Sequence, residues 1–111
     1  MGKINSRQKG CRGEREFAQL LRDHGYEAER GQQHAGGKDS PDVKSNMPNV
    51  HWEIKRTERL YLEDALAQSR RDAGNGEFAL VAHRKNHSEW VVIMGFDDFM
   101  KLFQAYERSL K

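Results

Sequence analysis

The segment from residue 50 to residue 55 most constrains how this chain can fold. Apolar and polar side chains alternate along it without interruption: Val50, His51, Trp52, Glu53, Ile54 and Lys55. Successive side chains of a β-strand point to opposite faces of its sheet, so a period of two is typical of a half-buried strand. We therefore predict a strand that buries one apolar face and presents an acid and a base, Glu53 and Lys55, side by side on the other.

The remaining patterns place helices and further strands around this one. Three glycines fall in the stretch before Asp42, and apolar residues recur at helical spacing near both ends of the chain. The last helix is expected to have its N-cap at Asp97, and its apolar face is formed by Phe96, Phe99, Phe103, Tyr106 and Leu110. The other predicted elements are a helix at Cys11–His24, a strand at Tyr26–Arg30, a loop at Gly31–Pro41, a strand at Asp42–Lys44, a helix with its less polar stripe at Leu62, Ala65, Leu66 and Ser69, and strands at Phe78–Ala82 and Trp90–Met94.

This order, α-β-β-β-α-β-β-α, predicts an α/β fold with a mixed sheet flanked by helices. The 111 residues fit one domain, 1–111, in which residues 1–10 are expected to form a basic, mobile arm. No stretch approaches the roughly 20 apolar residues of a membrane span, and no apolar segment follows the basic start as in a secretory signal. A single cysteine, Cys11, is in keeping with a reducing cytoplasm.

Two carboxylates are expected to converge beside Lys55. Asp42 follows Pro41 in an extended segment, and a hairpin-like pairing across Pro48–Asn49 would bring its carboxylate near that of Glu53. Two such carboxylates make a hard-oxygen site suited to Mg²⁺, and a lysine beside them can orient water or stabilise charge that grows on phosphorus. The alternative is a solvated Glu–Lys pair on an exposed sheet face, without any chemical role.

These residues resemble the PD-(D/E)XK nucleases, and among them the archaeal-type Holliday junction resolvases and their phage relatives. The resemblance extends from about Lys9 to Trp90. Its features are Gly10, the helix start Glu14–Arg15–Glu16, the apolar run Phe17–Leu21, the step Gly25–Tyr26, Arg30, Asp42, and Glu53 with Lys55.

The resemblance implies a restriction-endonuclease-like core of about five strands and assigns roles to single residues. Asp42 and Glu53 would be the principal ligands of Mg²⁺, for which Mn²⁺ could substitute, and Glu14 would complete the metal site. Lys55 would be the catalytic lysine, and Arg15 and Arg30 would contact phosphate or support the site. Gln68 matches a position where such enzymes often carry a polar residue near the site.

The distribution of charge is compatible with DNA despite the small net charge of +2, from 19 Lys and Arg against 17 Asp and Glu. Basic residues gather in the segments around the candidate site, where they could meet a phosphate backbone, or they could be ordinary solvated residues. The candidate DNA-binding residues are Arg7, Lys9, Arg12, Arg15, Arg30, Lys38, Arg56, Arg59, Arg84 and Lys85.

We therefore expect a Mg²⁺-dependent DNA endonuclease that acts on branched DNA in a bacterial or phage-infected cytoplasm. Two symmetric cuts in a four-way junction need two active sites, so the resemblance implies a homodimer, with the apolar face of the last strand and helix as one candidate surface. The alternatives are a nuclease of the same fold that acts on duplex, nicked or flap DNA, and a DNA-binding module of that fold that does not cut.

Overall fold

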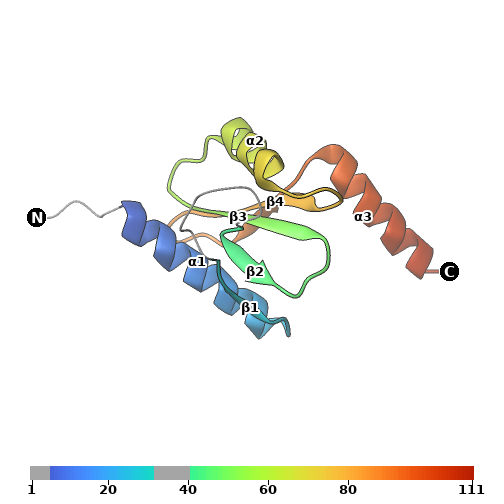
Figure 1. Ribbon diagram of the computed structural model, residues 1–111, viewed down its shortest axis with the longest axis horizontal. Helices are drawn as coiled ribbons and strands as arrows, with labels where there is room; N and C mark the ends of the chain where they lie inside the picture. Colours follow the sequence, from blue (N-terminus) through green and yellow to red (C-terminus); the bar gives the residue numbers. More distant parts are fainter. Residues whose placement is uncertain (1–5, 32–40) are drawn as a thin grey trace, which may run out of the picture.

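The computed structural model describes residues 6–31 and 41–111, and within them the predicted order of elements is confirmed (Figure 1). The elements are α1 (Ser6–Asp23), β1 (Ala28–Arg30), β2 (Val43–Ser45), β3 (Val50–Arg56), α2 (Leu62–Asp72), β4 (Phe78–Arg84), β5 (Val91–Ile93) and α3 (Phe96–Ser109). Together they form an α/β structure consistent with the expected restriction-endonuclease-like core.

The strands form one mixed sheet in the order β1-β2-β3-β4-β5. β3 and β4 pair in parallel over their whole length, from Val50 opposite Phe78 to Arg56 opposite Arg84, and the other neighbours pair antiparallel. The alternating strand of the sequence, β3, is therefore the central strand, with β2 on one side and β4 on the other.

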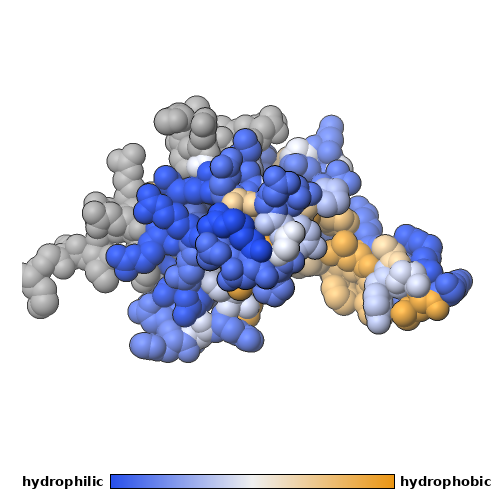
Figure 2. Space-filling model, turned by 90° about the horizontal axis from the view of Figure 1, so that it is seen from below, coloured by the Kyte–Doolittle hydropathy of each residue, from blue (hydrophilic) through white to orange (hydrophobic). Residues whose placement is uncertain are grey.

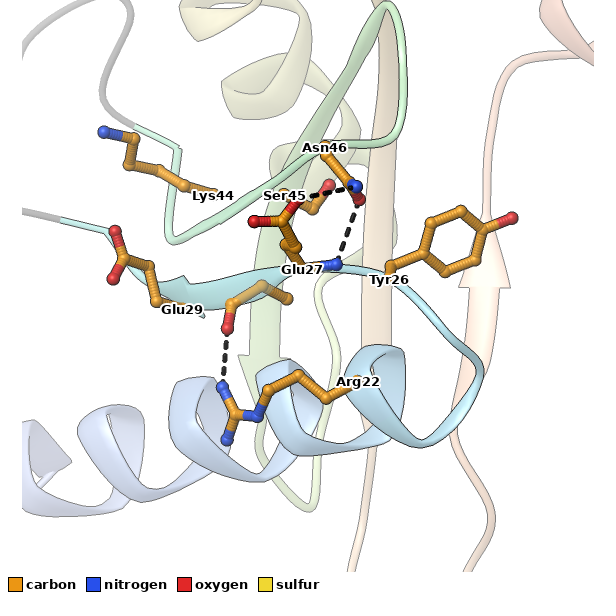
Figure 3. A pocket seen from close by; sticks show the side chains of 8 residues that line it. Arg22, Tyr26, Glu27, Glu29, Lys44, Ser45 and Asn46 are labelled. Carbon is orange, nitrogen blue, oxygen red and sulfur yellow. Dashed lines mark hydrogen bonds between the residues drawn. The ribbon is translucent and has the colours of Figure 1, made fainter.

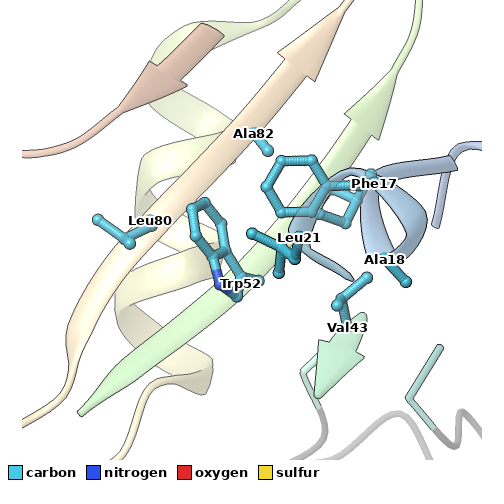
Figure 4. Close-up of a cluster of buried hydrophobic side chains, with 8 residues drawn as sticks. Phe17, Ala18, Leu21, Val43, Trp52, Leu80 and Ala82 are labelled. Atoms are coloured by element: carbon cyan, nitrogen blue, oxygen red, sulfur yellow. The ribbon is translucent and has the colours of Figure 1, made fainter. Parts of the chain in front are cut away.

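Helix α1 covers one face of the sheet and forms the main core with it (Figure 4). Phe17 and Leu21 point onto the even positions of β3, and the rings of Phe17 and Trp52 lie 4.7 Å apart between centroids. At Gly13 the helix passes so close to β3 that a Cβ atom would collide with the side chain of Arg56. A glycine at this position therefore allows the close approach of helix and strand.

Helix α2 covers the opposite face, where the odd positions of β3 point. Its Gln68 contacts Lys55, and its buried Ser69 donates a hydrogen bond to the carbonyl of Leu80 at 3.4 Å. The prediction that β3 is half buried is therefore wrong, because four consecutive residues, 51–54, are buried and include His51 and Glu53. A strand between two helical layers loses solvent on both faces, whatever the polarity of its side chains.

The predicted strands differ from the observed ones by one or two residues at their ends, and the starts of two helices also differ. Helix α1 begins at Ser6 instead of Cys11, since the arginine, glutamine and lysine in this stretch are good helix formers, and only residues 1–5 of the expected arm lie outside the described chain. The predicted N-cap of the last helix is wrong, because α3 begins after Gly95, whose carbonyl accepts the Phe99 N–H at 3.0 Å, and Asp97 lies in the first turn. Residues 32–40 of the predicted glycine loop lie outside the described residues.

Helix α3 leaves the sheet after β5 and extends away from the layers, which makes the molecule elongated at 58 × 29 × 26 Å (Figure 1). None of its side chains is buried. Apolar residues gather on this part of the surface in Figure 2, whereas the surface around the sheet is mostly hydrophilic. In the part of the chain that the structure describes, no helix combines the length and apolarity needed to cross a membrane.

Candidate active site

Asp42 is fixed directly beside the part of β3 that carries Glu53 and Lys55. Its backbone N–H donates to the carbonyl of Trp52 at 3.1 Å, and its carboxylate Oδ2 accepts the N–H of Ile54 at 2.8 Å. Its own carbonyl accepts the N–H of Gly31, also at 2.8 Å. The expected pairing across Pro48–Asn49 is present, and it places the Asp42 carboxylate at the one residue that separates Glu53 from Lys55.

Glu53 and Lys55 share the α2 face of β3, as the alternation predicts. The Lys55 ammonium lies 4.0 Å from Glu53 Oε2 and donates a hydrogen bond to Gln68 Oε1 at 3.0 Å. Glu53 is only 4% exposed, which rules out the alternative of a solvated Glu–Lys pair. A buried carboxylate requires a compensating charge, and the described structure offers it a lysine on one side and a histidine on the other.

His51 lies beside Glu53 on the same face, and the sequence reasoning had assigned it no role. Its ring is buried at 1% exposure, with Nε2 3.9 Å from Glu53 Oε1 and Nδ1 3.9 Å from Glu77 Oε1. The Glu53 carboxylate raises the pKa of His51, and the charges of Glu77 and Asp72 act in the same direction, while burial opposes them. The sequence did contain a sign of this contact, because His51 and Glu53 are two positions apart on one strand and therefore point to the same face.

Glu14 has a partner on the neighbouring edge of the sheet. The residue is buried on α1, and its Oε1 accepts a hydrogen bond from Arg30 Nε at 2.7 Å, which raises the pKa of Arg30. Within residues 6–31 and 41–111, no three acidic, histidine or cysteine side chains form a cluster able to hold a metal ion. The structure thus brings Asp42 to the Glu53–Lys55 segment, and it pairs Glu14 with Arg30.

Two of the candidate DNA-binding arginines take part in an internal network. Arg56 Nε lies 3.6 Å from Glu16 Oε1, and Arg84 donates a hydrogen bond to the same oxygen. Arg84 also donates to the carbonyl of Ser88 at 2.6 Å. These contacts join α1 to the ends of β3 and β4, so both arginines have a structural role beside any contact with phosphate.

The other candidate DNA-binding residues lie on α1, after β3 and β4, or outside the described residues. Four are exposed, on α1 or in the segments after β3 and β4: Arg12, Arg15, Arg59 and Lys85. Arg7 and Lys9 lie in the first turns of α1, and Lys38 lies outside the described residues. The exposed four can meet a polyanion without breaking the ion pairs described above.

A shallow groove of about 600 Å³ lies over the edge strand β1 and its neighbour β2 (Figure 3). Arg22 donates to the carbonyl of Ala28 at 2.5 Å across one side of it, and Asn46 bonds with Glu27 on the other. None of the predicted site residues that the structure describes lines this groove. Its lining of mixed charge gives no indication of a ligand.

The donor set beside β3 suits a hard cation. Asp42 and Glu53 would offer carboxylate oxygens, and Mg²⁺ is commonly held through only one or two carboxylates while it keeps several waters. A cluster of three protein ligands is therefore not required. The lysine next to the carboxylates is not a metal ligand, but it adds a donor for an anionic substrate.

The comparisons with known proteins are consistent with this geometry. A family model described as archaeal Holliday junction resolvase matches residues 5–106, which is most of the chain. No curated protein matches the sequence.

Proposed function

Because this chain belongs to the archaeal Holliday junction resolvase family, we propose that it cleaves four-way DNA junctions with the help of a divalent metal ion bound beside β3. The family implies a nuclease that cleaves branched DNA. The metal, the residues that bind it and the assembly of two chains are our proposals.

The observation that carries the proposal is the hydrogen bond from the Ile54 N–H to Asp42 Oδ2, at 2.8 Å. It joins the Asp42 carboxylate to the backbone of β3 between Glu53 and Lys55. The three residues therefore occupy one small region even though 12 positions separate Asp42 from Ile54 in sequence. This agrees with the order in which the motif of PD-(D/E)XK nucleases, which the sequence resembles, places its two acids and its lysine.

We assign the metal to Asp42 and Glu53, whose oxygens fit a hard divalent cation such as Mg²⁺ or Mn²⁺. Glu14 is proposed as a further acid of the site, one whose charge is shared with Arg30 at 2.7 Å. When bound, the ion would polarise the phosphodiester and lower the pKa of water.

The residues of the chain would do the remaining work. Lys55 is held by Gln68 and lies on the exposed side of Glu53, so its ammonium can orient the attacking water or meet the negative charge that develops on the phosphate. The water oxygen gives up a proton to solvent and forms a new bond to phosphorus as the bond to one sugar oxygen breaks. That oxygen leaves with a proton from solvent, so the products are a phosphate end and a hydroxyl end.

A junction is resolved only when two opposed strands are cut, and residues 6–31 and 41–111 of one chain hold one such constellation. We therefore propose that the active form is a homodimer with two sites. The exposed basic residues Arg12, Arg15, Arg59 and Lys85 would contact the phosphate backbone around each site.

The test compares three radiolabelled or fluorescent substrates, a mobile four-way junction, a flap and a linear duplex, in Mg²⁺, in Mn²⁺ and in EDTA. We expect the wild type to cut the junction in preference to the other two, and to lose all cleavage in EDTA. Lys55→Ala and Asp42→Asn should each abolish cleavage while junction binding, measured by gel shift, stays within about threefold of the wild type, which is less than 1 kcal/mol.

Lys44→Ala is the matched control, because Lys44 is an exposed lysine on the neighbouring strand β2. It should cut like the wild type. Cleavage by both Lys55→Ala and Asp42→Asn at wild-type rates would contradict the mechanism. Tight junction binding without any cut in either metal would instead favour a non-cleaving module, and equal cleavage of the flap or duplex would favour a nuclease of broader substrate range.

A further inference from the structure

His51 is buried to 1% exposure on the α2 face of β3, although none of the steps proposed above uses it. Its side chain points to the same face as those of Glu53 and Lys55, because the three residues are two positions apart on one strand. Glu53 lies between the other two, with Oε1 3.9 Å from His51 Nε2 and Oε2 4.0 Å from Lys55 Nζ. The order along this face is therefore histidine, carboxylate and lysine.

A second carboxylate faces the other nitrogen of the His51 ring. Glu77 precedes β4, and its Oε1 lies 3.9 Å from His51 Nδ1 and accepts the N–H of Gly74 at 2.7 Å. The charge of Asp72, at the end of α2, also acts on the ring. An ionised carboxylate only accepts hydrogen bonds, so each ring nitrogen is placed to donate. The ring is thus set between a carboxylate of the α2–β4 connection and the carboxylate of the candidate site.

The Nε2 atom of His51 is buried and has no hydrogen-bond partner among the described residues, because 3.9 Å is beyond the reach of a hydrogen bond. A buried polar atom without a partner is unfavourable, and so is a buried carboxylate without a compensating group. A shift of about 1 Å by Glu53 Oε1 would bring both groups into hydrogen-bonding range. The buried donor therefore points to Glu53 as its acceptor.

The position of Lys55 depends on how Glu53 is held. In residues 6–31 and 41–111, Glu53 has ion-pair contacts with His51 and Lys55 only. Without His51, the buried carboxylate would have the ammonium of Lys55 as its remaining partner and should close on it. At present this lysine donates to Gln68 at 3.0 Å, and its side chain is 29% exposed. A close ion pair with Glu53 would turn it inward and would also block the carboxylate from a cation.

We propose that His51 is a positioning residue of the site, whose Nε2–H holds Oε1 of Glu53 from the buried side and keeps the carboxylate from closing on Lys55. Oε2 is then left for a divalent cation, and Lys55 is left for the phosphate. The proposal rests on the proposed function, because a cation and a phosphate are what the two freed groups would meet. Partners that hold metal ligands in place commonly contribute roughly 10–100-fold to metal affinity or activity.

The first experiment measures Mn²⁺ binding to the metal-free protein by the fall in the paramagnetic resonance signal of free Mn²⁺. Three substitutions separate the donor from the size of the side chain. His51→Gln places an amide N–H at the reach of Nε2, His51→Asn places one at the reach of Nδ1 only, and His51→Leu has none. The dissociation constant should rise roughly 10–100-fold in His51→Leu and His51→Asn, and it should stay within about threefold of the wild type in His51→Gln.

His24→Leu is the control, because it removes a histidine at the exposed end of α1. It should bind Mn²⁺ and cut junctions like the wild type. Circular dichroism checks that each variant retains a cooperative thermal transition. If His51→Leu does not fold, His51→Asn and His51→Gln still decide the result, since they differ by one methylene group.

The second experiment measures junction cleavage by the same preparations over a range of Mg²⁺ concentrations. The concentration that gives half the maximal rate should rise in His51→Leu and His51→Asn, and the maximal rate should fall because Lys55 turns towards Glu53. His51→Gln should recover both quantities. Losses that follow the midpoint of unfolding, with His51→Gln no better than His51→Leu, would show a merely structural role and overturn the proposal.

Failure of this role and failure of the proposed function have different signatures. If the wild type and His51→Leu bind Mn²⁺ and cut junctions equally well, the nuclease stands and the role of His51 is overturned. Tighter Mn²⁺ binding by His51→Leu would also overturn it, since His51 would then compete with the ion for Glu53. A wild type that neither binds Mn²⁺ nor cuts would overturn both.

A last measurement needs neither metal nor DNA. The losses in the midpoint of unfolding for His51→Leu and Glu53→Gln should add up to more than the loss in the double variant, because both substitutions break the same contact. Strictly additive losses would show that the two side chains do not interact, and they would overturn the proposal whatever the cleavage assay shows.

Discussion

The two faces of β3 lie in two different environments. On one face, Trp52 and Ile54 pack under α1 in an apolar core. On the other, His51, Glu53 and Lys55 lie under α2 and form a line of charged and polar groups. Both faces are largely buried, so burial alone does not separate a structural face from a chemical one. The two faces should differ in what is lost when a side chain is removed. We expect a loss of stability on the α1 face and a loss of cleavage activity on the α2 face.

The largest effect is expected on the α1 face. Trp52→Ala removes a side chain that is 4% exposed and packs on Phe17 at 4.7 Å, so the free energy of unfolding should fall by about 3–5 kcal/mol. Chemical denaturation measures it. Tyr61→Ala is the control at a site that is 66% exposed, where we expect a change within about 0.5 kcal/mol. Equal losses in the two variants would show that the α1 face is not the core.

A change on the other face should leave the fold intact and remove activity. Glu53→Gln keeps the shape of the side chain but loses the charge that we propose to bind the cation, so junction cleavage should fall by about 10²–10³-fold, equivalent to roughly 2.7–4 kcal/mol of barrier. The protein should still unfold cooperatively, because Gln keeps the volume of the side chain, while the loss of the carboxylate that faces His51 and Lys55 lowers the midpoint of unfolding. Full cleavage by a stable Glu53→Gln protein would break the distinction between the two faces.

A smaller effect on the rate of cleavage is expected at Gln68, which lies on α2 and contacts Lys55. Gln68→Ala removes the acceptor that holds Lys55 at 3.0 Å, and a hydrogen bond of about 1.5 kcal/mol corresponds to a roughly tenfold loss of kcat. Gln68→Glu restores an acceptor at the same position and should recover most of the rate. If both variants cut equally fast, Gln68 does not position the lysine. A rise in KM with unchanged kcat would indicate a binding role instead.

The smallest effect should come from the buried hydroxyl on α2. Ser69→Ala loses a hydrogen bond to the Leu80 carbonyl that is long, at 3.4 Å, so we expect a loss of about 1 kcal/mol or less in the free energy of unfolding and an unchanged cleavage rate. Denaturation and junction cleavage on the same preparation measure both. A loss as large as that of Trp52→Ala would mean that the α2 face holds the fold together as strongly as the apolar face does.

The sequence was informative wherever a local pattern decides the outcome. The alternation of apolar and polar residues along β3 places Glu53 and Lys55 on one face, and the apolar stripes predict α1, α2 and α3. The turn at Pro48–Asn49 was enough to bring Asp42 to β3. These features depend on residues that are near one another in the chain, so one sequence contains the information.

What the sequence could not supply depends on distant partners. The partner of Glu14 is 16 residues away at Arg30, and that of Glu16 is 68 residues away at Arg84. No periodicity indicates which charges meet across the sheet. For the same reason the polar odd positions of β3 looked exposed, because nothing within the strand reveals that α2 lies over it.

The alternation of β3 also limits how this protein can change over time. Substitutions can alter one face and leave the other in place, but the insertion or deletion of a single residue between Val50 and Trp52 would exchange the faces of everything beyond it. Glu53 would then enter the apolar core, and Trp52 would enter the site. We therefore expect length variation among natural variants to collect in the segments that join the strands, while this stretch keeps its length and accepts only replacement.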